Sequence, residues 1–195
     1  MHLIRLCGVL LVQTFVSIRS EEDSFSLVGE HQLVKGRLVH TFPALAKEWK
    51  VTFDFKPTNY NYRGPAQVLQ MTIGGKVGNI GDRTPALWMH KTRGVYIVTA
   101  LSGKAAVGKY IKKKPTLNQW SKVEISQVKE GYKYMFSLVI KGETLWSVEN
   151  TQPKEFSNVK VFASSDWHVA QAGSIRGLKI ESKLPGTNKL LSEKY

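Results

Sequence analysis

The basic side chains of this 195-residue chain are concentrated in one segment. Residues 83–123 contain nine Lys and Arg side chains and no Asp or Glu, whereas the whole chain has 28 basic and 15 acidic residues. A surface of one charge sign attracts polyanions, and added salt weakens the attraction. We therefore predict a site for an anionic polymer, with the alternative that these charges form only a well-solvated face. Its candidate residues are Arg83, Lys91, Arg93, Lys104, Lys109, Lys112, Lys113 and Lys114.

Two tryptophans lie next to expected turns. Trp88 follows the turn-forming segment 81–85, and Trp167 follows two serines and an aspartate. An indole ring in such a place can stack on a sugar ring. The alternative is that both rings are buried, which is the usual place for so large an apolar side chain.

No arrangement of catalytic residues is evident. A glycoside hydrolase needs two carboxylates that face each other across the sugar, roughly 5–10 Å apart, and no expected strand carries acids at alternate positions. Asp54 and Glu124 each stand alone, and no Gly-x-Ser-x-Gly turn accompanies His90 or His168. We expect the protein not to be an enzyme.

Residues 1–20 have the order of a secretory signal peptide. Arg5 precedes a short apolar run at 6–16, and small and polar residues follow up to Ser20. The run is shorter than the roughly 20 residues that span a bilayer, and no longer apolar run follows, so no transmembrane segment is expected. Cys7, the only cysteine, lies in this leader, which leaves no thiol for a disulfide, a zinc site or a nucleophile. We predict a secreted, extracellular protein, for which nucleic acid is an unsuitable partner.

Alternating hydrophobicity predicts β-strands along most of the remaining chain. Trp49, Val51, Phe53 and Phe55 alternate with polar side chains, so one face of this strand is expected in a core. Further strands are expected at 67–73, 94–101, 120–128, 132–140, 145–148, 158–163 and 174–180. No amphipathic helical pattern competes with them. The fold class predicted from roughly eight to ten short strands is all-β, a two-sheet antiparallel sandwich or jelly roll.

The same patterns divide the chain into four segments. Residues 1–20 are the signal peptide, and residues 21–47 are an N-terminal extension with an edge strand at 33–42. The sandwich domain occupies residues 48–182, and residues 183–195 form a polar tail. Pro115 ends the lysine-rich run 108–115 and favours a loop there.

Three stretches resemble a known family. They are Gly74-Gly75 with 81–88, then 117–125 with the strand and hairpin that follow, and 159–167 with 173–180. Together they resemble the laminin-G-like, concanavalin A-like jelly rolls of secreted animal proteins. The most similar members are the small single-domain versions in cnidarian (coral) extracellular and skeletal organic matrix proteins. The resemblance implies a sandwich whose loops or concave face bind carbohydrate or protein, although a fold does not fix a function.

The same resemblance raises calcium as a cofactor. Such domains often hold this ion on loop carboxylates and carbonyls, because a hard cation takes six to eight oxygen ligands. Asp82 and Asp166 are the weak candidate ligands, since both stand in expected loops. The alternatives are that Asp82 pairs with Arg83 or caps a turn, and that Asp166 forms an Asx turn before Trp167. We expect no other cofactor.

Two functions from different classes follow from these observations. The first is a secreted, non-enzymatic binding or adhesion module of the extracellular matrix, which recognises glycan or another anionic polymer through the basic residues. The alternative is a structural component of a skeletal organic matrix, mineralised or not, without a specific small ligand. The expected partners are extracellular glycans or acidic matrix proteins.

Overall fold

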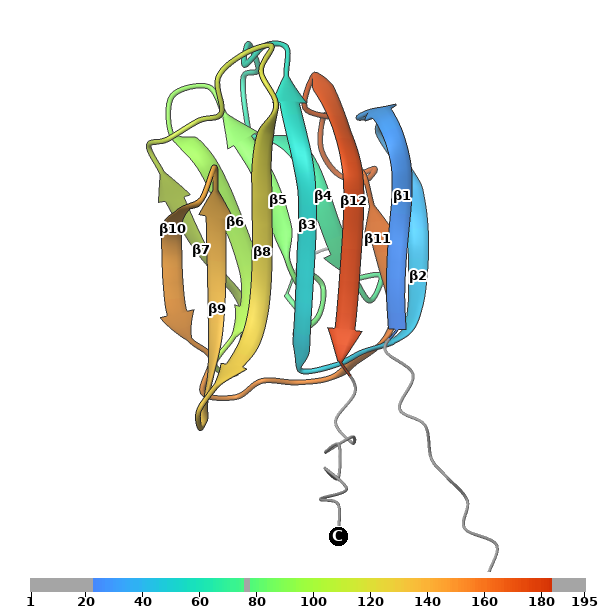
Figure 1. Cartoon of the computed structure of the whole chain (residues 1–195), viewed down its shortest axis with the longest axis vertical. Helices are drawn as coiled ribbons and strands as arrows, with labels where there is room; N and C mark the ends of the chain where they lie inside the picture. The colour runs from blue at the N-terminus through green and yellow to red at the C-terminus, as the bar shows by residue number, and fades with distance from the viewer. Residues whose placement is uncertain (1–22, 76–77, 184–195) are drawn as a thin grey trace, which may run out of the picture.

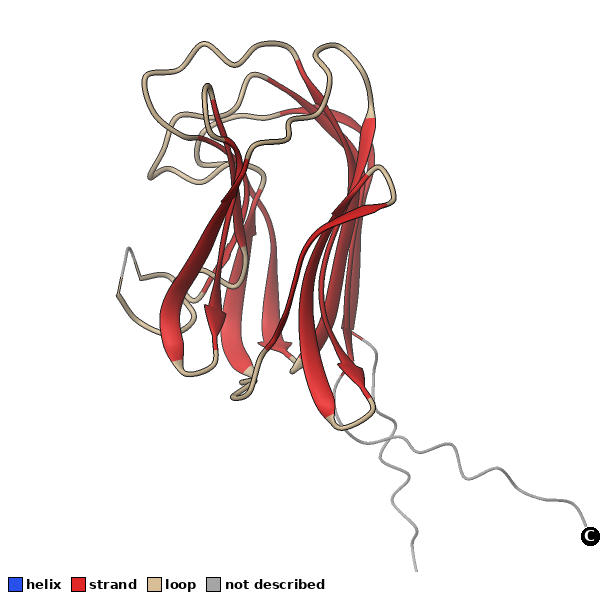
Figure 2. Ribbon diagram, turned by 90° about the vertical axis from the view of Figure 1, so that its left-hand side faces the viewer, coloured by secondary structure: helices blue, strands red, loops and turns tan. Residues whose placement is uncertain are grey.

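Twelve strands form two antiparallel six-stranded sheets in the part of the chain that the structure, a computed structural model, describes: residues 23–75 and 78–183 (Figure 1). Sheet A has the order β1 (Asp23–Gln32), β12 (Gly173–Lys183), β3 (Glu48–Pro57), β8 (Ser121–Glu130), β9 (Lys133–Ile140) and β10 (Glu143–Glu149). Sheet B has the order β2 (Leu38–Leu45), β11 (Phe156–Phe162), β4 (Ala66–Thr72), β5 (Ala86–His90), β6 (Gly94–Leu101) and β7 (Lys104–Ile111). The sheets stack face to face (Figure 2). The predicted fold class, a two-sheet antiparallel sandwich, is confirmed.

The core lies between the two sheets and follows the predicted alternation. The four apolar side chains of β3 that alternate in the sequence, Trp49, Val51, Phe53 and Phe55, are all buried there. Every second side chain of β3 instead reaches the outer face of sheet A. Successive side chains of a strand point to opposite sides of its sheet, so each sheet has an inner face in the core and an outer face.

Three local predictions need correction. The edge strand expected at 33–42 is a strand only in its second half, because residues 33–37 form a turn at Gly36 (φ +77°) and β2 begins at Leu38. This turn joins β1 of sheet A to β2 of sheet B. The lysine-rich run is not all loop, since β7 continues to Ile111 and only the residues after it leave the sheet. The short strand β5 was not expected.

Three long loops gather at one end of the sandwich, here called the long-loop end and drawn uppermost in Figure 2. The loops that follow β3, β7 and β11 lie at this end, because each of these strands runs toward it (Figure 1). The β4–β5 loop (73–85) leaves from the opposite end, because β4 runs antiparallel to β11. The expected signal peptide (1–20) and nearly all of the expected tail (183–195) lie outside the described residues. Among the described residues there is no helix that is long and apolar enough to cross a membrane.

Candidate functional site

The outer face of sheet B is covered by loops over its central strands, β4 and β5, whereas the outer side chains of β7 and β11 are largely exposed. All seven residues of β4 are buried, although only one of its two faces packs into the core. Two segments flank its outer face: the β4–β5 loop (73–85) and the β11–β12 loop (163–172). The second is attached to β4 by backbone hydrogen bonds from Ser164 N to Val68 O (3.1 Å) and from Gln67 N to Val169 O (2.8 Å).

A line of buried amides fixes both loops to this face. Gln67 Oε1 accepts a hydrogen bond from the backbone N of Ser165 (2.8 Å), and Gln67 Nε2 donates to Gln70 Oε1 (2.7 Å). Gln70 Nε2 donates in turn to the backbone O of Asp82 (3.1 Å). Because both glutamines are fully buried, these bonds form away from competing water and hold the two loops at a set spacing.

An aromatic row crosses the strands beside these amides. The backbone register pairs Gln67 with Trp88, Trp88 with Tyr96, and Tyr96 with Tyr110, so one side chain from each of β4, β5, β6 and β7 lies in line. The two tyrosine rings stack at 4.1 Å, and the Trp88 ring lies 5.5 Å from that of Tyr96. Gly108 makes room for the row, because a Cβ there would lie only 2.8 Å from Tyr96 Oη.

Exposure increases along the row. Trp88 is 1% exposed and offers no free ring face, so the prediction that it stacks on a sugar gives way to its alternative, burial. Tyr96 is half-buried, and Tyr110 is 39% exposed. The aromatic surface that a ligand can reach is therefore that of Tyr110 and part of Tyr96.

Two of the predicted basic residues lie over this row. The guanidinium carbon of Arg83 is 5.4 Å from the centre of the Trp88 ring, and that of Arg93 is 5.0 Å from the Tyr110 ring. Neither arginine belongs to any of the six ion pairs found among the described residues. Both charges thus remain available to an anion.

His168 lies next to Trp88, at the buried end of the aromatic row. Its ring meets that of Trp88 edge to face, at 5.5 Å and 75°. Burial, followed by the charges of Arg83 and Lys35, lowers the pKa of His168 below its ordinary value of 6.5. The imidazole is therefore neutral at pH 7, although it lies among cations.

The other predicted basic residues divide into two places. Lys91 and the run 112–114 meet at the long-loop end, where Lys114 Nζ donates to the backbone O of Lys91 (2.8 Å). Lys104 begins β7 and therefore lies roughly 25 Å from Lys112, at about 3.3 Å per residue. Lys109 faces the opposite sheet, with Nζ 6.0 Å from the Trp146 ring. The segment that is uniformly basic in sequence is not one continuous patch in space.

Lys113 and Lys114 also border a hollow of about 170 Å³ at the long-loop end. Its walls include the apolar side chains of Ile140 and Leu145, and Glu143 on its rim forms an ion pair with Lys113. The charge of Lys113 is thereby partly neutralised. Lys114 has no carboxylate partner among the described residues and lies instead over the Tyr60 ring, at 4.7 Å.

Trp167 lines a separate hollow of about 150 Å³ that includes Lys160, Phe162 and Asp166. Its side chain is half-buried, and Trp167 remains a predicted residue for sugar stacking.

The two candidate calcium ligands have different surroundings. Asp82 is buried, and its Oδ2 accepts a hydrogen bond from the backbone N of Asn79 (2.9 Å), which is the turn-capping role. It does not pair with Arg83. Asp166 is exposed. Within 23–75 and 78–183, no group of three or more His, Cys, Asp or Glu side chains is placed to hold a metal ion.

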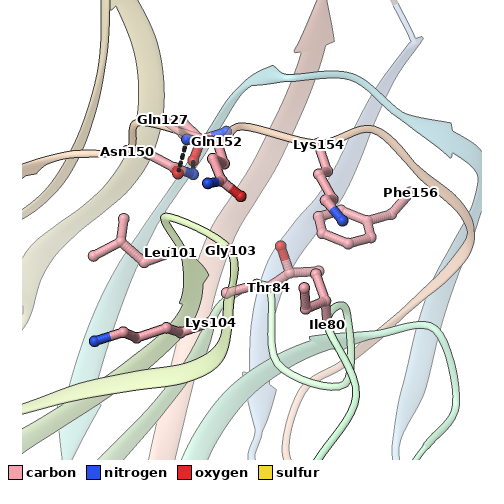
Figure 3. A pocket seen from close by; sticks show the side chains of 11 residues that line it. Ile80, Thr84, Leu101, Gly103, Lys104, Gln127, Asn150, Gln152, Lys154 and Phe156 are labelled. Atoms are coloured by element: carbon pink, nitrogen blue, oxygen red, sulfur yellow. Dashed lines mark hydrogen bonds between the residues drawn. The ribbon is translucent and has the colours of Figure 1, made fainter.

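A third, smaller hollow lies between the sheets at the end opposite the long loops (Figure 3). Asn150 Nδ2 donates to Gln127 Oε1 (2.6 Å) at its edge, and Lys104 and Lys154 also line it. Its free volume of about 10 Å³ suits roughly one water molecule, so it is not a site for a glycan.

Sequence reasoning missed most of the residues that build this face. Gln67, Gln70, Tyr96 and Tyr110 were not predicted as site residues, and His168 was considered only as a catalytic histidine. Their role depends on strand register, which brings residues 67, 88, 96 and 110 into one line. The only local signal is that glutamine occurs twice in a strand that is otherwise apolar.

No protein-family model and no curated protein matches the chain. Among solved structures, it is similar to the binding domain of Botulinum neurotoxin serotype D (TM-score 0.55, 15% identity), over 85% of this chain and 44% of that one. It is similar to the heptameric SAP-like pentraxin from Limulus polyphemus (0.50, 17%), over 82% and 76%. A third similar structure is Ruminococcus gnavus IT-sialidase CBM40 bound to α2,3 sialyllactose (0.50, 15%), over 83% and 95%. At these identities the likeness is one of fold alone, a two-sheet antiparallel jelly-roll sandwich.

Proposed function

We propose that this protein is a non-enzymatic binding module for acidic glycans, and that the glycan lies on the outer face of sheet B. The observation that carries the proposal is the stacked pair Tyr96 and Tyr110 with Arg93 over Tyr110, where this arginine has no carboxylate partner among the described residues. The exposed aromatic ring suits the C–H face of an acidic sugar, and the guanidinium without a carboxylate partner suits its acid group.

The chemistry of the two groups is complementary. A ring face packs against the apolar C–H face of a pyranose, while a guanidinium offers a planar fork of donors to a carboxylate or sulfate. Lys91, Lys112 and Lys114 at the neighbouring long-loop end add attraction that depends on charge alone and weakens with salt. The aromatic row then supplies the preference for carbohydrate over other polyanions.

The fold supports the proposal by analogy. One structure of similar fold is a CBM40 bound to sialyllactose. An analogy of fold does not transfer a ligand site, so the proposal rests on this chain's own residues.

A binding module needs no reacting groups, and the carboxylates of the described chain support this class. Asp54 and Glu124 lie on the outer face of sheet A, where each pairs with a cation: Asp54 with Arg176, and Glu124 with Lys50. A paired carboxylate on the face opposite the aromatic row has no part in hydrolysis of a glycan bound there.

Secretion, a place in the extracellular matrix and kinship with the laminin-G-like domains of cnidarian matrix proteins belong to the same proposal. The signal peptide that would direct export lies at 1–20, outside the described residues. The alternative is a structural component of a skeletal matrix that pairs with acidic matrix proteins. The lysines at the long-loop end favour this structural alternative, because Lys91 and Lys114 have no acidic partners among the described residues and can pair with an acidic protein.

The test compares two arginines that both lie over aromatic rings. Arg93 contacts Tyr110 without an acid, whereas Arg176 contacts Trp120 and pairs with Asp54. We expect Arg93→Gln to weaken binding to heparin oligosaccharide, measured by calorimetry, by about tenfold (about 1.4 kcal/mol), and Arg176→Gln to change it less than twofold. Equal losses from both would show attraction by net charge alone. No saturable binding by the wild type to heparin, hyaluronate or chondroitin sulfate would overturn the proposal in favour of the structural alternative.

A further inference from the structure

Three ring and guanidinium nitrogens beside the aromatic row are buried and have no hydrogen-bond partner in the part of the chain that the structure describes. They are Arg83 Nε, Trp88 Nε1 and His168 Nδ1. The residues are mutual neighbours, since Arg83 Cζ and the His168 ring each lie within about 5.5 Å of the Trp88 ring. Buried unpaired polar atoms are uncommon in folded proteins, and a group of three in one place calls for an explanation.

The chemistry of the three groups limits what fits among them. Arg83 Nε and Trp88 Nε1 can only donate a hydrogen bond, and His168 Nδ1 donates in one tautomer and in the protonated ring. A bound water accepts two such bonds and can donate one hydrogen to an unprotonated Nδ1. An oxyanion accepts from Arg83 and Trp88, accepts also from Nδ1 when that nitrogen carries a proton, and meets the positive charge of Arg83.

We propose that Arg83, Trp88 and His168 form a subsite for one oxyanion, a sulfate or a carboxylate, and that its occupation is coupled to protonation of His168. Only the identity of the larger molecule that carries the oxyanion rests on the function proposed above. The subsite lies at the buried end of the same aromatic row on which Tyr110 is the exposed end.

The construction of the site supports this role. Trp88 is set in β5, and its 1% exposure leaves the indole no freedom to turn away. Arg83 and His168 come from the two loops that Gln67 and Gln70 tie to β4, through Asp82 O and Ser165 N. The side chains of Arg83 and His168 are both half-buried, so an oxyanion can approach them from solvent.

The coupling to pH follows from the charges around His168. The charged groups that face it are Arg83 on the β4–β5 loop and Lys35 on the β1–β2 loop, while the sheet below presents the rings of Trp88 and Tyr96. Asp166 on its own loop points to the hollow lined by Trp167. With only cations facing it, the empty site disfavours a proton on the imidazole, and a bound oxyanion reverses that preference. Binding therefore takes up a proton, and affinity rises as pH falls, by at most tenfold per pH unit.

The experiment titrates the full chain with three probes and follows two NMR signals. The probes are sodium sulfate, sodium glucuronate and neutral methyl glucoside. The signals are the indole N–H of Trp88, assigned with Trp88→Phe, and the imidazole of His168. We expect sulfate or glucuronate, or both, to shift the indole N–H in a saturable way and to raise the pKa of His168, and methyl glucoside to do neither. Comparison of the first two probes shows whether the site selects a sulfate ester or a carboxylate.

Three variants make the assignment specific. Arg83→Gln should weaken oxyanion binding at least tenfold, while Lys104→Gln, which removes a cation at the far end of β7, should change it less than twofold. His168→Gln should keep binding but make it independent of pH between 5 and 7.5. Equal effects of Arg83→Gln and Lys104→Gln would overturn the subsite, as would a Trp88 signal that does not move in either anion.

Failure of this inference differs from failure of the proposed function. If heparin oligosaccharide binds and depends on Arg93 while the anions leave Trp88 and His168 unchanged, the glycan face stands and the oxyanion subsite is wrong. If the anions shift both signals but no glycan binds, the subsite stands without the proposed function. Thermal unfolding of each variant, compared with wild type, separates loss of binding from loss of folding.

Discussion

The outer faces of the two sheets present cations over aromatic rings in two different ways. On sheet A, Arg176 and Lys56 lie over the Trp120 ring at 4.3 and 4.5 Å, and each also pairs with a carboxylate, Asp54 or Glu30. On sheet B, Arg83 and Arg93 lie over Trp88 and Tyr110 with no carboxylate partner among the described residues. Five of the six ion pairs of the described chain join residues of the strands of sheet A.

The difference separates a solvated surface from a binding surface. An arginine that already holds a carboxylate must give up that partner before it can bind an anionic ligand, whereas an arginine held only by a ring need not. Exposed ion pairs add little stability, at most about 1 kcal/mol each, so the pairs on sheet A chiefly neutralise charge. The unpaired cations on sheet B keep the attraction for an outside anion.

The largest expected effect comes from the amides that tie the loops to sheet B. Gln67→Ala removes the acceptor of the Ser165 backbone N–H and the donor to Gln70 Oε1. Since both groups stay buried without partners, the free energy of unfolding should fall by about 2–5 kcal/mol. Urea unfolding measures it.

Thr52→Ala on the outer face of sheet A is the matched control, and it should cost less than about 1 kcal/mol because Thr52 is only half-buried. A loss below about 0.5 kcal/mol for Gln67→Ala would show that water replaces the lost bonds and that the loops need no amide support.

A smaller effect on stability, but a large one on binding, is expected from Gly108→Ala. The new Cβ would lie 2.8 Å from Tyr96 Oη and 3.0 Å from Tyr96 Cε2 and Val98 Cγ2, so the Tyr96 ring must move away from β7. Such overpacking costs about 1–3 kcal/mol, and it separates Tyr96 from Tyr110. We expect heparin oligosaccharide to bind at least tenfold more weakly, measured by calorimetry.

Ala106→Val on the same strand is the control for Gly108→Ala, since Ala106 is exposed and a larger side chain there meets solvent. Unchanged glycan binding in Gly108→Ala would show that the stacked tyrosines are not the ligand platform.

These positions also show which parts of the molecule the sequence determines locally. The strand β3 was predicted because its four inner side chains alternate with polar ones. The strand β5 was missed because it is covered on both sides, and a strand buried on both faces shows an apolar run without alternation. The edge strand β7 was missed in part because its small and basic side chains give little apolar signal.

The site depends on register and loop placement, which a single sequence does not reveal. Arg83 and Arg93 were candidates by charge, and the structure places both over the aromatic row. Lys104 and Lys109 were candidates by the same criterion, yet the first is at the far end of β7 and the second faces the other sheet. Charge in the sequence identifies the segment, and pairing between strands selects which of its residues meet.

Acid should affect the two faces in different pH ranges. The pKa of His168, on sheet B, is held low by burial and by Arg83 and Lys35, so the unfolded chain protonates first and the free energy of unfolding falls as pH drops below about 6.5. On sheet A the pKa of Glu181 is lowered by its hydrogen bond to Lys179, and that of Glu30 by those to Lys56 and Ser174. Their contribution is present above about pH 4.5 and is lost below it.

Urea unfolding at a series of pH values measures both ranges. We expect His168→Gln to flatten the change between pH 6.5 and 5 and to leave the range below 4.5 as in wild type. Glu181→Gln should reduce the change below pH 4.5 and leave the change between pH 6.5 and 5 as in wild type. If both variants gave the same pH profile, neither His168 nor Glu181 would account for the loss of stability in its pH range.

The smallest expected effect comes from making sheet A resemble sheet B. Asp54→Asn leaves Arg176 over Trp120 without its carboxylate, which is the condition of Arg93 over Tyr110. Stability should fall by less than about 1 kcal/mol, since the pair is exposed. Retention on a heparin column should rise only as much as in Glu181→Gln, which adds the same charge but frees Lys179, a cation with no ring contact. A much greater rise in Asp54→Asn would mean that one unpaired guanidinium over an indole is enough to bind the polymer, and that the tyrosine row of sheet B adds nothing to it.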